Sequence, residues 1–277
     1  MFSLFWSLCV TSVSAQVNLL PIFSDNMVLQ QQTQAPIWGE SKPNKEIEII
    51  TSWDQKRYTI QADARGKWKT KVTTPAAGGP YAITISDGKQ VKLSNVMIGE
   101  VWVCSGQSNM EMQVEGWGKV MNYQQEKEEA NSYPNIRFLL IEKATSPLPV
   151  SDIKAAGNGW QVCSSKSVAD FSAAGYFFGR DLHKYQNVPI GLVDTSWGGT
   201  YIETWTSKEA LATMPDMQKK LDVLNELPIT KEDRERKFHS DLEDWKKDVE
   251  KIDKGFVNSK AVWAAVDLEV STCKTMK

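Results

Sequence analysis

Histidine, cysteine and clustered basic residues are all scarce in this sequence of 277 residues. The two histidines and four cysteines have no spacing typical of metal ligands, so we expect neither a metal nor another cofactor. Lys and Arg together number 32 and Asp and Glu 34, a formal net charge of −2. Because no basic cluster accompanies this balance, the sequence argues against a nucleic-acid partner.

Long apolar runs are absent beyond the first fifteen residues. Residues 2–13 are apolar and uncharged, and Val13-Ser14-Ala15 places small or β-branched residues just before Gln16. We interpret residues 1–15 as a secretory signal peptide that lacks the usual positively charged start. The sequence therefore predicts a protein that is secreted or periplasmic and has no membrane span.

Removal of that signal would take Cys9 and leave Cys104, Cys163 and Cys273. Three thiols do not form a disulfide framework. Two interpretations stay open: a bridge between Cys104 and Cys163, or two buried free thiols.

The rest of the composition is that of a globular protein with a real core, at 41% hydrophobic and 24% charged residues. The length accommodates one large domain or two of ordinary size. Eleven tryptophans are many. Most are expected in the core, although indole rings also stack on the C–H surfaces of sugars.

Residues 16–95 have the pattern of a small N-terminal β-sandwich. Short strand-like runs alternate with turn signals such as Ala64-Arg65-Gly66 and Asp87-Gly88. The predicted strands cover residues 37–39, 46–50, 56–61, 68–72 and 81–85. This region contains no catalytic constellation, and we interpret it as a binding or packing module.

From residue 96 the pattern becomes that of an α/β fold. Apolar strands are predicted over 101–104, 135–141 and 188–194, with a helix around 119–130 and an amphipathic helix over 168–185 that Asp170 or Ser172 could cap. Strand, helix and strand at these lengths predict a βαβ unit. We expect the three strands to be parallel in one sheet, with residues 101–104 buried on both faces.

The end of the first of these strands is a candidate nucleophile corner. Gly106 allows a sharp turn, and Ser108 would follow at the start of a loop or helix, where backbone N–H groups favour developing negative charge. An ordinary strand-to-helix turn uses the same residue types. However, Gly198 and Gly199 form a second small-residue corner after residues 188–194. Ligands of parallel sheets bind beyond the carboxyl ends of the strands, so two such corners on one edge favour catalysis.

Several longer motifs resemble the sialate O-acetylesterase family of SGNH-type hydrolases. The motifs are Gly-Gln-Ser-Asn-Met at 106–110, residues 171–180, residues 189–200, and the opening stretches 23–30 and 37–39. The resemblance spans residues from about 20 to 206. It implies an SGNH-hydrolase-like parallel sheet flanked by helices, with Ser108 as nucleophile. It also implies that the N–H groups of Ser108 and of Gly198 or Gly199 form part of the oxyanion hole, and that Gln107 and Asn109 contact the substrate.

Two features of that family are missing from this sequence. Its members carry a further motif near Trp-Tyr-Gln-Gly-Glu, and a late Asp-x-x-His that supplies the catalytic base. Neither histidine here matches that base: His183 falls near the end of a predicted helix and His239 in the charged stretch 231–254, where surface or capping roles are expected. We therefore expect a C-terminally truncated member with very low activity of its own.

The resemblance divides the chain into a signal peptide (1–15), a β-sandwich (16–95), an incomplete hydrolase domain (96–255) and the start of an inserted β-domain (256–277). It predicts an esterase that removes O-acetyl groups from sialic acid or related sugars of a glycan. Two alternatives stay open. One is a xylan-type acetyl esterase on the same scaffold, and the other is a non-catalytic carbohydrate-binding fragment.

Overall fold

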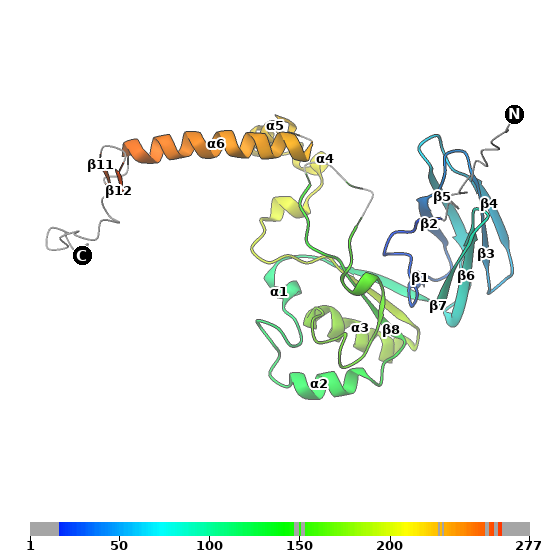
Figure 1. Cartoon of the computed structure of the whole chain (residues 1–277). Helices are drawn as coiled ribbons and strands as arrows, with labels where there is room; N and C mark the ends of the chain where they lie inside the picture. Colours follow the sequence, from blue (N-terminus) through cyan, green and yellow to red (C-terminus); the bar gives the residue numbers. More distant parts are fainter. Residues whose placement is uncertain are drawn as a thin grey trace, which may run out of the picture. The chain divides into compact units, whose positions relative to one another are not determined.

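The computed structural model of the chain describes residues 17–146, 150, 153–226, 228, 230–252, 255–257 and 260–261 (Figure 1). These residues fall into two compact units: the described residues up to 145 together with those of 150–205, and residue 146 together with the described residues from 206 onward. The predicted signal peptide and most of the predicted inserted β-domain lie outside the described residues. The domain bounds given above remain predictions.

The strands and helices of the first unit follow one another in chain order. They are β1 (Val28–Gln30), β2 (Gln34–Glu40), β3 (Glu46–Thr51), β4 (Arg57–Gln61), β5 (Lys67–Thr73), β6 (Gly78–Ser86), β7 (Gln90–Cys104), α1 (Ser108–Glu111), α2 (Tyr123–Ala130), β8 (Ile136–Leu140), β9 (Gln161–Val162), α3 (Ala173–Gln186) and β10 (Ile190–Asp194). Short 3₁₀ turns occur at Ala156–Asn158 and Ile202–Trp205.

The N-terminal β-region is built as the alternating sequence pattern predicts. In β2, Ala35, Ile37 and Gly39 are buried while their neighbours are not, the period of two that a half-buried strand requires. β2 pairs antiparallel with β5, and β3 pairs antiparallel with both β4 and β6. The five strands predicted here are confirmed to within a few residues, and the short β1 is an addition.

A single long strand, β7, joins the β-region to the α/β region. Its first part pairs antiparallel with β6, its middle pairs parallel with β1, and residues 100–104 pair parallel with β10. The main sheet therefore runs without a break in the order β4-β3-β6-β7-β10-β8-β9. The predicted division after residue 95 falls inside this strand (Figure 1).

The α/β region confirms the predicted parallel strands. β10 lies between β7 and β8 and is parallel to both, with Leu192 opposite Trp102 on one side and Phe138 on the other. α3 packs on this sheet, and the Ser172 hydroxyl caps it by accepting a hydrogen bond from the Gly175 N–H at 3.0 Å. α2 begins at Tyr123, later than the predicted residue 119.

The prediction that residues 101–104 are buried on both faces is wrong. Cys104 is buried, but the side chains of Trp102 and Val103 are 43% and 67% exposed. The reason is position in the sheet: among the described strands, residues 100–104 have a partner on the β10 side only. An apolar run signals burial in the finished sheet but does not reveal which strand is at the edge.

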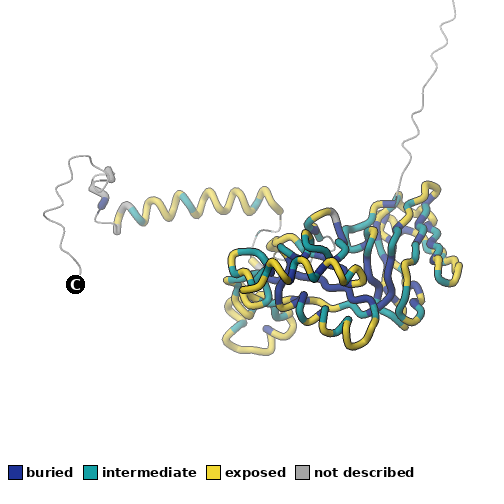
Figure 2. The backbone as a smooth tube through the Cα atoms, turned by 90° about the horizontal axis from the view of Figure 1, so that it is seen from below, coloured by how far each residue is buried: buried dark blue, intermediate teal, exposed yellow. Residues whose placement is uncertain are grey.

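The second unit is mainly helical. It contains α4 (Lys208–Leu211), a 3₁₀ turn at Pro215–Met217, α5 (Gln218–Glu226), α6 (Lys231–Ile252) and the short hairpin of β11 (Phe256–Val257) and β12 (Lys260–Ala261). Most of α6 is exposed, whereas many strand residues of the first unit are buried (Figure 2). None of the helices in the described part of the chain has both the length and the apolar character needed to cross a membrane.

Both described cysteines are free and buried. Cys163 donates a hydrogen bond from Sγ to the Ala130 carbonyl at 3.3 Å. Cys104 lies under α3, where a Cβ added at Gly175 would come within 2.9 Å of its sulfur. Burial raises the pKa of Cys104 to about 11 and that of Cys163 to about 12, so both remain protonated thiols. Of the two interpretations left open, the structure has the free thiols.

Candidate functional site

Ser108 stands at the corner between β7 and α1. The backbone turns at Gly106, whose φ of +143° is in the region that favours glycine. Gln107 is extended, and Ser108 is the first residue of the short helix α1. Its side chain is exposed to solvent. The predicted corner is therefore present, with the hydroxyl accessible.

The Gly198 corner follows β10 and is hydrogen-bonded to the Ser108 corner. The Thr195 N–H donates to the Cys104 carbonyl and the Trp197 N–H to the Gly106 carbonyl, both at 2.9 Å. The Gln107 side-chain amide also donates to the Thr200 carbonyl. These bonds continue the β7–β10 pairing past the strand ends, so the parallel sheet itself brings the two corners together.

Gly198 lies directly beside Ser108. A Cβ added at Gly198 would be 2.9 Å from Ser108 Oγ and 2.5 Å from Glu111 Oε2. There is consequently no room for a side chain at this position. At Gly199 the φ is +75°, and an added Cβ would meet nothing within 4 Å. The expected proximity of Ser108 to the two glycines is found, while their chemical roles remain predictions.

Glu111 is a member of this cluster that the sequence reasoning missed. Its carboxylate accepts a hydrogen bond from the Gly198 N–H and forms an ion pair with Lys143. The hydrogen bond from Lys143 is the main reason that the pKa of Glu111 is below its usual value, and the Gly198 N–H adds to the effect. The sequence feature that could have identified Glu111 is its spacing from Ser108. It follows Ser108 by three residues, about one helical turn, so the two side chains lie on the same side of a helix.

The Gly198 N–H already donates to Glu111, so the hydrogen-bond donors that remain available to a ligand are other backbone N–H groups of the two corners. Among the described residues, neither the Ser108 N–H nor the Gly199 N–H has a hydrogen-bond acceptor. Asn109 is exposed on α1, and Gln107 is exposed although its amide nitrogen is engaged by Thr200. The proposed contacts of Gln107 and Asn109 with substrate therefore remain predictions.

Asp194, the last residue of β10, is hydrogen-bonded to Ser196 in the loop that leads to Gly198. Its Oδ1 accepts hydrogen bonds from the Ser196 N–H at 2.9 Å and from the Ser196 hydroxyl at 2.6 Å. The side chain is only 2% exposed, and this burial raises its pKa against the opposing effect of the Ser196 bonds. Asp194 is thus placed to shape the loop, and it is shielded from a ligand in solvent.

His183 lies at the opposite end of the strands from Ser108. Its Nδ1 is 2.7 Å from the carbonyl oxygen of Val188, just before β10 begins. Ser108 follows the other end of these strands, about 15 Å away for five residues at the usual rise. The expected structural role of His183 near the helix end fits this position. His239 is exposed on α6 in the second unit.

The described residues contain no cluster of three or more His, Cys, Asp or Glu side chains that could hold a metal ion. What the site offers is an accessible hydroxyl, backbone N–H donors and a nearby carboxylate–lysine pair. The backbone N–H donors suit the stabilisation of a negatively charged oxygen beside a serine, whereas the Glu111 carboxylate is itself negative and is balanced by Lys143.

Comparison with known proteins identifies relatives that match about two thirds of the chain. Residues 98–226 match the family model described as carbohydrate esterase, sialic acid-specific acetylesterase. The sialate O-acetylesterase of Mus musculus is 29% identical over 205 residues, covering 68% of this chain and 37% of that protein. The human sialate O-acetylesterase is 29% identical over 203 residues, covering 68% and 38%.

A solved structure has the same fold. The carbohydrate acetylesterase from Xanthomonas citri is 33% identical, with a TM-score of 0.65, over 73% of this chain and 45% of that one. The match includes a mostly parallel sheet flanked by helices and preceded by a β-rich region, as the sequence predicts. The chain spans less than half the length of each of these relatives.

Proposed function

Because residues 98–226 match the family model of sialic acid-specific carbohydrate acetylesterases, we propose that the chain carries the nucleophile half of a serine esterase site for O-acetylated sugars. The observation that supports this most directly is the position of Ser108 Oγ beside Gly198, at the ends of two adjacent parallel strands. The similarity to the sialate O-acetylesterases of mouse and human adds weight to it.

In the proposed reaction, Ser108 Oγ attacks the carbonyl carbon of the acetyl ester while its proton passes to a base. The carbonyl oxygen becomes an oxyanion, which backbone N–H groups stabilise. Collapse of this intermediate releases the sugar hydroxyl and leaves acetyl-Ser108, and water then releases acetate. The free N–H groups of Ser108 and Gly199 are the donors that the geometry favours, because Glu111 engages that of Gly198.

Among the described residues of the first unit, no histidine lies beside Ser108 to act as its base. His183 is held at the other end of the sheet, and the family motif that supplies the base is missing from the sequence. Loss of triad members lowers turnover by about 10⁴-fold or more and leaves only the effect of oxyanion stabilisation and binding. We therefore propose that the base comes from residues outside these 277.

The test is hydrolysis of nitrophenyl acetate by the 277-residue chain and by its Ser108→Ala variant. Both should turn over barely above background, because an unassisted hydroxyl is a poor nucleophile. The corresponding Ser→Ala change in the carbohydrate acetylesterase from Xanthomonas citri serves as the control and should remove nearly all activity. Robust, Ser108-dependent turnover by the short chain would refute the missing base.

One observation favours a wider substrate class than sialic acid. The solved relative, at 33% identity, is a carbohydrate acetylesterase, a class broader than the sialic acid-specific enzymes. A xylan-type acetyl esterase is therefore the second candidate. Hydrolysis of O-acetylated sialic acid and of acetylated xylo-oligosaccharides, measured side by side as acetate release on the active longer protein, separates the two.

A further inference from the structure

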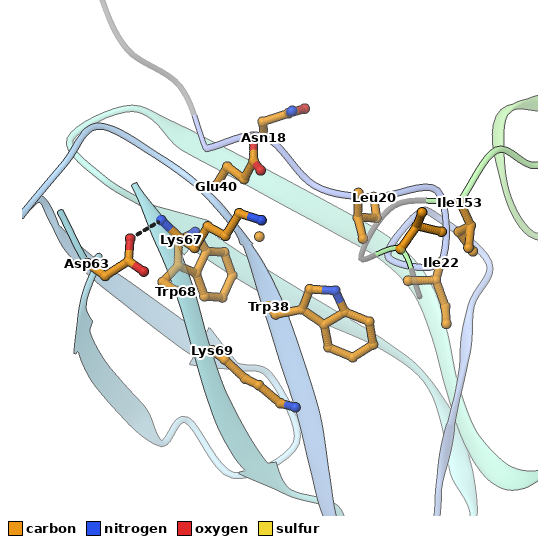
Figure 3. Close-up of a pocket in the computed structure, with 12 residues that line it drawn as sticks. Asn18, Leu20, Ile22, Trp38, Glu40, Asp63, Lys67, Trp68, Lys69 and Ile153 are labelled. Carbon is orange, nitrogen blue, oxygen red and sulfur yellow. Dashed lines mark hydrogen bonds between the residues drawn. The ribbon is translucent and has the colours of Figure 1, made fainter. Parts of the chain in front are cut away.

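A cavity in the β-region has no part in the chemistry proposed above. It has a volume of about 620 Å³, within the range of small-molecule sites. Its floor is one face of the β2–β5 ladder, and part of its wall is the preceding segment with Asn18, Leu20 and Ile22 (Figure 3). All of these residues belong to the first unit.

The register of β2 and β5 places four side chains on the floor. Trp38 is opposite Lys69 and Glu40 is opposite Lys67, so all four project from the same face, while the Trp68 side chain between them turns into the core. Trp38 is partly buried and packs edge-on against Phe23, with ring centres 4.6 Å apart. The charged side chains are exposed.

The floor and the wall are held in place before any ligand arrives. The backbones of Asn18 and Glu40 exchange two hydrogen bonds of 2.9 Å. A Cβ at Gly39 would come within 2.7 Å of the Asn18 oxygen and 2.8 Å of the Trp68 ring, so these layers are in close contact. A preformed cavity of this kind avoids the cost of ordering its walls on binding.

The lining combines apolar surface with hydrogen-bonding groups of both signs. Trp38, Leu20 and Ile22 supply the apolar part. Lys67 and Lys69 are balanced by Glu40 and Asp63, so the cavity carries no excess charge that would select an anion. The indole N–H of Trp38 has no acceptor among the described residues, and Figure 3 shows its nitrogen turned toward the gap between Lys67 and Leu20.

From this lining we infer that the cavity is a second, non-catalytic binding site for a neutral oligosaccharide of two or three pyranose rings. A pyranose presents C–H faces that match the tryptophan and the aliphatic side chains, and a rim of hydroxyls that both donate and accept hydrogen bonds. The Trp38 N–H and Asn18 bind such hydroxyls, and Glu40 and Lys69 complete the contacts. The site acts independently of the proposed esterase chemistry.

The test measures equilibrium binding by isothermal titration calorimetry of the full chain with xylotriose, maltotriose and N,N′-diacetylchitobiose, and with 3′-sialyllactose as the anionic probe. At least one neutral sugar should bind saturably and more tightly than 3′-sialyllactose. Trp38→Ala and Lys69→Ala should each weaken that binding about tenfold. Lys69 is exposed, so its variant tests the site even where loss of the Trp38–Phe23 packing disturbs folding.

Two matched controls keep the result specific. Trp117→Ala removes an exposed tryptophan that does not line the cavity, and Ser108→Ala alters the candidate catalytic corner; both should bind the sugar like the parent chain. The inference is overturned if no neutral sugar binds, if neither Trp38→Ala nor Lys69→Ala weakens binding, or if Ser108→Ala abolishes it. Failure of the esterase assay would leave this result unchanged, so the two proposals fail separately.

Discussion

The contact of Gly198 with Glu111 and Ser108 leads to a quantitative prediction for Gly198→Ala. The φ of Gly198 lies outside the left-handed region, so alanine brings no backbone strain and its cost is steric. The new methyl would be 2.5 Å from Glu111 Oε2 and 2.9 Å from Ser108 Oγ, and both must move. Overpacking of this kind lowers the free energy of unfolding by about 1–3 kcal/mol.

Glu111→Ala tests where that cost originates. By itself it removes the Lys143 ion pair, worth about 1 kcal/mol or less because the Lys143 side chain is 44% exposed and screened by water. It also removes the hydrogen bond from the Gly198 N–H, worth about 1–3 kcal/mol. In the double variant the nearest clash is gone. We therefore expect it to be more stable than additivity predicts, by about 1 kcal/mol of coupling.

The assay is urea unfolding of the full chain, monitored by tryptophan fluorescence. It compares the free energy of unfolding of the parent chain, the two single variants and the double variant, at constant m-value. Gly199→Ala is the matched control. Its cost is backbone strain at a φ of +75°, with nothing near the added methyl, so it should be additive with Glu111→Ala. Additivity within about 0.5 kcal/mol for the Gly198 cycle would show that the carboxylate is not the obstacle.

Two further predictions concern the exposed edge of β7 and the buried thiols. Val103→Lys should raise solubility, measured as the monomer fraction by light scattering, without lowering the free energy of unfolding, because it adds charge to an exposed apolar edge; loss of stability would mean that the side chain is covered. In a chain with Cys9→Ser and Cys273→Ser, Cys104 and Cys163 should not react with a thiol reagent at pH 8 and should react fully in denaturant. The thiolate is the reactive form, and burial raises the two pKa values to about 11 and 12, so rapid labelling of the folded chain would contradict the burial.

Several parts of the fold could be predicted because their causes are local. Ser172 caps α3 because its hydroxyl is placed to accept from the N–H three residues later, a relation contained in the sequence order. Strands such as β3 and β5 follow from alternating side chains between turn residues. The parallel sheet followed from apolar strands separated by an amphipathic helix, and the Ser108 corner followed from its place at the end of one of them.

The rest could not be predicted because it depends on pairing between distant segments. The exposure of Trp102 and Val103 follows from the edge position of β7 after residue 99, which no local pattern encodes. The engagement of the Gly198 N–H by Glu111 joins residues 87 positions apart. The Trp38 floor required the β2–β5 register, since a shift by one residue would turn that ring toward the core.

The sequence by itself therefore determined the kinds of elements, the α/β class and the residues at the two corners, since periodicity, capping and turn chemistry act over a few residues. Only the tertiary structure decided which strand lies at the edge, which N–H groups remain free beside Ser108, and which side chains surround a cavity. Those outcomes depend on long-range packing, in which each contact competes with many alternatives of similar local energy.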